Sequence, residues 1–65
     1  MTQNANEVLL TTIEGPKGSA DIYEVSLPGP TIEVEYLVVF GDERRGFPSM
    51  GEAHIYANQV AGLQE

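Results

Sequence analysis

The chain has 65 residues, which leaves room for one domain with one small hydrophobic core. Apolar residues make up 42% of it, enough for a folded protein, and the absence of cysteine excludes disulfides and thiolate metal sites. Ten acidic residues against three lysines and arginines give a net charge of −7, which disfavours direct binding to nucleic acid or to anionic membranes. We therefore expect a protein partner of basic character, a cation, or a second copy of the chain.

The first seven residues are polar, and we predict a tail at residues 1–7 and a single small domain at residues 8–65. The tail lacks the basic region and the apolar stretch of a secretory signal. The apolar run Leu37–Phe40 is far shorter than the ~20 residues that cross a bilayer. We therefore expect a cytoplasmic protein that does not insert into a membrane.

Two segments rich in β-branched and aliphatic residues, 8–13 and 20–27, predict the first two strands. The turn signals Glu14–Ser19 and Pro28–Pro30 follow them, because proline presets φ and glycine accepts positive φ. Two sets of side chains alternate along the second strand, and the pattern does not select the buried one. These sets are Ala20, Ile22 and Glu24 on one face and Tyr23, Val25 and Leu27 on the other.

Residues 31–40 give the clearest strand signal, because apolar residues alternate with polar ones at a period of two. The even-numbered side chains are predicted to face the core: Ile32, Val34, Tyr36, Val38 and Phe40. The opposite face begins with Thr31, Glu33 and Glu35 but continues with Leu37 and Val39. This change predicts that the carboxyl end of the strand is covered on both sides.

The segment 41–46 predicts a tight turn that leads into a short fourth strand at 44–47. A two-residue loop centred on Gly41-Asp42 would pair Phe47 with Tyr36, and one centred on Asp42-Glu43 would pair it with Val38. Either loop places Phe47 on the core face, whereas a three-residue loop would reverse it.

A capping box at Ser49 and Glu52 predicts the start of a helix, and Gly62 is a suitable C-cap. Its apolar stripe recurs at three- and four-residue spacing and comprises Ala53, Tyr56, Ala57, Val60 and Ala61. A helix of about 12 residues is about 18 Å long, the length of a strand of five or six residues. The chain is thus predicted to be an α+β protein: an antiparallel three- to four-stranded β-meander with one C-terminal α-helix packed on one face.

This order of strands and helix is similar to the small three-stranded DNA-binding domain at the amino terminus of some phage integrases. The resemblance concerns architecture alone. Those domains bind DNA with a basic sheet, whereas the best strand here carries Glu33 and Glu35. The resemblance therefore implies a fold and no DNA-binding function.

Residues with catalytic potential are few. His54 is the only histidine and is expected on the flank of the helix, and the serines are expected in a turn, at a strand end and in a cap. The carboxylates at Glu33, Glu35, Asp42 and Glu43 match no spacing of a zinc site or a calcium loop. We therefore predict no enzyme, no cofactor and no metal.

The predicted interaction surface consists of Glu33, Glu35, Leu37, Val39 and Arg44. Leu37, Val39 and Ile55 have no place in the predicted core, and small domains often use such residues to self-associate. The leading hypothesis is a non-enzymatic protein-interaction module that forms a homodimer through the exposed sheet face or edge. In the alternative, the amino-terminal segment or another strand order covers Leu37 and Val39. A second hypothesis is an acidic inhibitor that mimics nucleic acid and blocks a basic nucleic-acid-binding protein.

Overall fold

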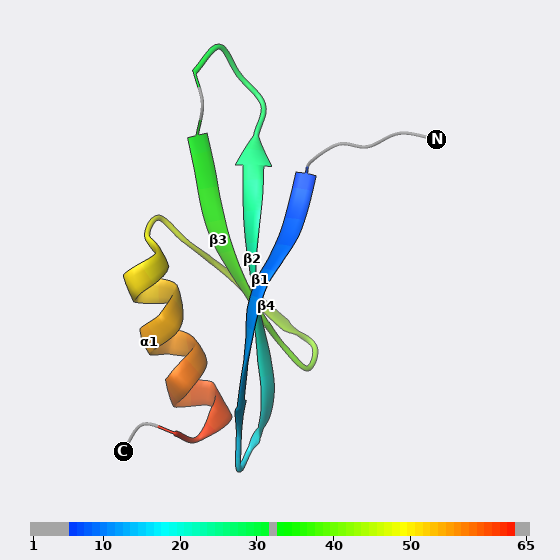
Figure 1. Ribbon diagram of the computed structural model, residues 1–65, viewed down its shortest axis with the longest axis vertical. Helices are drawn as coiled ribbons and strands as arrows, with labels where there is room; N and C mark the ends of the chain where they lie inside the picture. The colour runs from blue at the N-terminus through cyan, green and yellow to red at the C-terminus, as the bar shows by residue number, and fades with distance from the viewer. Residues whose placement is uncertain (1–5, 32, 64–65) are drawn as a thin grey trace.

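The computed structural model describes residues 6–31 and 33–63. These described residues form four strands and one helix: β1 (Asn6–Gly15), β2 (Gly18–Leu27), β3 (Glu33–Phe40), β4 (Glu43–Phe47) and α1 (Met50–Ala61). The strands form one antiparallel sheet in the order β1-β2-β3-β4, and α1 packs against one face of it (Figure 1). The predicted α+β meander is therefore confirmed, including its fourth strand.

The first hairpin is longer than the sequence predicted. β1 begins at Asn6, so Asn6 and Glu7 belong to the sheet, where they pair with Ser26 and Val25, and not to the predicted tail. Residues 1–5 of that tail lie outside the described residues, as does Ile32. Thr31 precedes β3, because the ladder between β2 and β3 ends at the pair of Leu27 and Glu33.

Both tight turns have two-residue loops. Gly15 pairs with Gly18 in the first hairpin, and Phe40 pairs with Glu43 in the last one. The last loop is therefore Gly41-Asp42, where Gly41 has a φ of 61°. This register places Phe47 opposite Tyr36 on the core face, which confirms the first of the two predicted loops.

The capping residues predicted at both ends of α1 are confirmed. The Ser49 hydroxyl oxygen accepts a hydrogen bond from the Glu52 N–H at 3.3 Å. At the other end Gly62 has a φ of 87°, and Leu63 donates its N–H to the Asn58 carbonyl oxygen at 2.9 Å. This arrangement is a Schellman motif, which satisfies carbonyl groups that the helix end leaves free.

The carboxyl end of α1 is docked onto the β1–β2 turn. The Lys17 N–H donates a hydrogen bond to the Ala61 carbonyl oxygen at 2.9 Å. Gly15 permits this close approach, because a Cβ at Gly15 would collide with the same carbonyl oxygen and would lie 3.0 Å from the Leu63 Cγ. The turn therefore fixes where the helix lies on the sheet.

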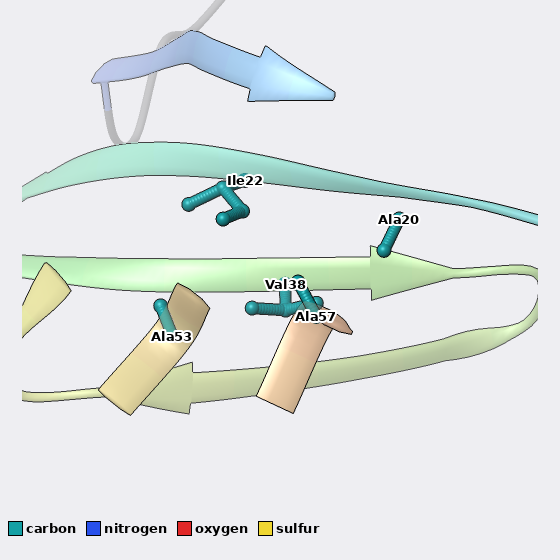
Figure 2. Close-up of a cluster of buried hydrophobic side chains, with 5 residues drawn as sticks. All are labelled: Ala20, Ile22, Val38, Ala53 and Ala57. Carbon is teal, nitrogen blue, oxygen red and sulfur yellow. The ribbon is translucent and has the colours of Figure 1, made fainter. Parts of the chain in front are cut away.

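The core is small and is lined by alanine on the helix side. Its buried residues come from β2, β3 and α1: Ala20, Ile22, Val38, Ala53 and Ala57 (Figure 2). Ile22 and Val38 are the largest side chains that are fully buried. The three alanines of the predicted stripe bring α1 close to the sheet, which leaves little room for larger groups.

The helix covers one half of the sheet. Its 12 residues span about 18 Å, whereas the ten residues of β1 or β2 span about 33 Å. Three strands therefore extend beyond the helix towards the loop at Pro28–Pro30 (Figure 1). We call this part, residues 6–10, 24–27 and 33–35, the open half, and the rest the covered half. Val34, which was predicted to face the core, is only half-buried because it lies in the open half.

Candidate interaction surface

The five residues predicted to form an interaction surface all lie on one face of the sheet. The odd-numbered residues of β3 point away from the helix, because the even-numbered Val38 lies in the core. Arg44 on β4 pairs with Val39 and therefore points the same way. We call this the outer face; its other members, given by cross-strand pairing, are Glu7, Leu9, Thr12 and Glu14 on β1, Ser19, Asp21, Tyr23, Val25 and Leu27 on β2, and Gly46 on β4.

The two edge strands meet over the outer face through an ion pair. The Arg44 guanidinium lies 3.7 Å from the Glu7 carboxylate. Strands lie about 4.8 Å apart, so the edges of a flat four-stranded sheet would be about 14 Å apart. Cross-strand pairing also puts Glu7 level with Glu35, whereas Arg44 is level with Val39, four residues further along β3. This diagonal contact fits a strongly twisted sheet that curls towards this side, as the crossing strands of Figure 1 show.

This curl shields the central apolar residues of the outer face, namely Val25, Leu37 and Val39. Val25, paired with Glu7 on one side and Glu35 on the other, is only 8% exposed. Leu37 and Val39 are half-buried. Glu35 lies over Gly46 of β4, where a Cβ would collide with its carboxylate. The prediction that the end of β3 is covered on both sides thus holds in part, through edge residues and not through a second layer.

A run of exposed apolar residues lies on β1, outside the predicted surface. Val8, Leu9 and Leu10 are 54%, 52% and 42% exposed, and Leu27 is exposed beside them on β2. The sequence of residues 8–13 predicted a strand without indicating how much of it the helix would cover. The predicted length of the helix indicated this exposure, because a helix of about 12 residues covers five or six residues of a strand and not ten.

The two edges of the sheet differ in how they are protected. β1 is hydrogen-bonded to β2 alone, and its other side is a free edge within the described residues. Between Glu7 and Gly15 this edge has no lysine, arginine or proline, and its only irregularity is a β-bulge at Leu10. β4 is only five residues long and exposes Glu43, Arg44 and Arg45. Short and charged edges discourage pairing with another strand, so β1 is the open edge.

The remaining candidates for chemistry are dispersed. His54 is half-buried on α1, Ser19 and Ser26 are exposed, and Ser49 caps the helix. Within residues 6–31 and 33–63 there is no group of three or more metal-ligating side chains. Nor does any helix in this part of the chain have the length and apolar character needed to cross a bilayer.

The second arginine packs against the core edge. The Arg45 guanidinium carbon lies 5.4 Å from the centre of the Tyr56 ring, which in turn lies 5.2 Å from the Phe47 ring. The Tyr56 hydroxyl donates to the Glu43 carboxylate at 3.5 Å. Arg45 therefore has a structural contact on the helix side, whereas Arg44 belongs to the outer face.

Comparison with known proteins finds no matching family model, no matching curated protein and no matching solved structure.

Proposed function

We propose that the chain is a small, non-enzymatic protein-interaction module that self-associates through the open half of its sheet. The observation that carries this proposal is the run of three exposed apolar residues, Val8, Leu9 and Leu10, on an edge strand that has no charged or proline residue between Glu7 and Glu14. Val8 and Leu9 point to opposite faces of the sheet, so exposed apolar side chains flank this free edge on both sides. Exposed apolar residues that cluster in this way are typical of interaction sites, unlike single ones scattered over a surface.

The small core supports association as a source of stability. A single core in a chain of this size rarely contributes more than about 3–5 kcal/mol, and small domains usually add disulfides, metals or oligomerisation. This chain has no cysteine, and its described residues offer no metal cluster. Association with a partner that binds only the folded state stabilises that state in proportion to the logarithm of the partner concentration.

The net charge predicts how salt should affect self-association. Two copies that each carry −7 repel one another, and at 0.15 M ionic strength charges separated by more than about 8 Å are largely screened. Self-association driven by apolar contacts should therefore become tighter as salt is added.

Sedimentation equilibrium of the full chain over a range of concentrations, at low and at moderate salt, tests the proposal. We expect a monomer–dimer equilibrium whose dissociation constant falls as salt rises. A chain that stays monomeric at the highest concentration reached, at both salt levels, would contradict the proposal.

The acidic outer face favours a second candidate, an inhibitor that occupies the basic groove of a nucleic-acid-binding protein. Five carboxylates lie on this face, those of Glu7, Glu14, Asp21, Glu33 and Glu35. Binding of this kind rests on charge, so it should weaken steeply as salt is added. Its salt dependence is thus opposite in sign to that of self-association, and one titration separates the two candidates.

A further inference from the structure

The unpaired edge of β1 presents backbone N–H and C=O groups, and these groups limit what kind of partner can bind there. Alternate residues of an edge strand direct N–H and C=O groups away from the sheet, and another strand satisfies all of them at once. The side chains beside these groups, Val8, Leu9 and Leu10, are exposed and apolar. The occupant is therefore an extended strand with apolar side chains.

Other parts of the surface fit a partner less well. On the outer face, Leu37 and Val39 are half-buried, and a second sheet placed over them would desolvate the Glu33 and Glu35 carboxylates. The β4 edge exposes Glu43, Arg44 and Arg45. An extended partner at that edge would meet three charged residues in a row, so β1 is the better site.

The chain itself carries a strand with the required properties, namely β1. The segment Val8–Ile13 is uncharged, so two copies can approach there although each carries −7 overall. A two-fold axis perpendicular to the sheet makes the pairing antiparallel and self-complementary. Assembly also ends at two copies, because pairing uses both open edges and leaves a charged β4 at each end of the joined sheet.

We infer that β1 of one copy pairs antiparallel with β1 of a second copy, so that two four-stranded sheets join into one sheet of eight strands. This inference rests on the proposed function and specifies its interface: the β1 edge, and not the outer face.

Lysine substitutions test the interface in the full chain. Leu9→Lys places a charge on the edge but lowers the negative charge of each copy, so a loss of dimer cannot be attributed to greater overall repulsion. Ile55→Lys is the matched control, because Ile55 is 53% exposed on α1 and Leu9 is 52% exposed. Leu37→Lys tests the outer face.

Sedimentation equilibrium at moderate salt gives three distinguishable outcomes. We expect Leu9→Lys to raise the dissociation constant of the dimer by about tenfold or more, because a desolvated charge at the edge opposes strand pairing, while Ile55→Lys leaves it unchanged. A dimer that survives Leu9→Lys but is lost with Leu37→Lys would overturn the β1 pairing and the open half as the interface, and would leave self-association itself standing. A natural chain that is monomeric throughout would overturn both.

The absence of cysteine permits a second, geometric test that does not depend on loss of binding. Single cysteines placed in turn at positions 8–13 report which residues lie near their own copies, since disulfides form only when the two Cα atoms are about 4.4–6.8 Å apart. We expect the yield of cross-linked dimer to peak at one or two β1 positions near the two-fold axis. Yields at β1 no higher than that of a cysteine at Ile55 would overturn the inference.

Discussion

The covered and the open half of the sheet are built from the same strands, yet they bury very different amounts of apolar surface. In the covered half Ile22 and Val38 are almost completely buried beneath α1. In the open half Val8 and Leu9 are each more than half exposed. The difference arises from helix length, because α1 spans about 18 Å beside strands of about 33 Å.

This difference in burial implies that the covered half stabilises the monomer and that the open half is available for association. The free energy of folding is concentrated where α1 meets β2 and β3, and substitutions there should destabilise the monomer. The open half contributes less to the monomer: Val25 is buried there, but Val8, Leu9, Leu10 and Leu27 are exposed to water. Its residues are the ones that we propose for association, so substitutions there should change the dimer and leave the monomer fold intact.

The largest effect is expected from shortening a side chain in the covered half. Ile22→Ala should lower the free energy of unfolding by about 2–5 kcal/mol, because it removes buried methyl groups and leaves a cavity. Leu9→Ala should lower it by less than about 0.5 kcal/mol at concentrations where the chain is monomeric, because Leu9 is exposed. Urea unfolding followed by circular dichroism measures both, and equal effects would contradict the division into halves.

The contact between α1 and the first turn should show the next largest effect. Gly15→Ala should destabilise the fold by about 1–3 kcal/mol, since its Cβ would collide with the Ala61 carbonyl group. Gly51→Ala is the control, because nothing lies within 4 Å of a Cβ there. Alanine at this helical position should be neutral or stabilise by up to about 1 kcal/mol. If Gly15→Ala behaved like Gly51→Ala, α1 would not be docked at the turn.

Loss of the N-cap of α1, at the end where the helix begins to cover the sheet, should have a smaller effect on stability. Ser49→Ala removes the acceptor of the Glu52 N–H and should destabilise the fold by about 1 kcal/mol. Ser26→Ala, at an exposed strand position in the open half, should change the stability by less than about 0.5 kcal/mol. Thermal unfolding of the two variants makes the comparison, and a larger effect at Ser26 would argue against it.

The smallest effect is expected from the ion pair across the outer face. The side chains of Arg44 and Glu7 are 59% and 43% exposed, so solvent screens their attraction. A double-mutant cycle with Arg44→Gln and Glu7→Gln should give a coupling below about 0.5 kcal/mol that disappears at high salt. A coupling well above 1 kcal/mol would mean that this pair holds the curl of the sheet.

The local signals of the sequence predicted most of the fold. The alternation along 31–40, the capping box at Ser49 and the C-cap at Gly62 each specify structure within a few residues, and all three were confirmed except at the start of β3. The two-residue loop Gly41-Asp42 was one of two predicted alternatives, because turn residues alone do not fix the register.

The site was harder to predict, because exposure depends on distant parts of the chain. Alternation places Leu37 and Val39 on the face of Glu33, which was correct, but it does not reveal that Glu7 reaches Arg44 over that face. Likewise the residue types of 8–13 predict a strand but not its exposure. Their exposure depends on how far α1 extends along the sheet. The sequence of the strand does not reveal this tertiary contact.

Amide hydrogen exchange at several protein concentrations tests the central claim most directly. The amides of Ile22 and Val38, in the covered half, should exchange slowly at every concentration, because α1 covers them in each copy. The amides of β1 that face the open edge, between Glu7 and Thr12, should exchange quickly in dilute solution and slowly once the chain has dimerised. Exchange along β1 that stays the same while sedimentation shows a dimer would contradict the claim that this edge is where the molecule associates.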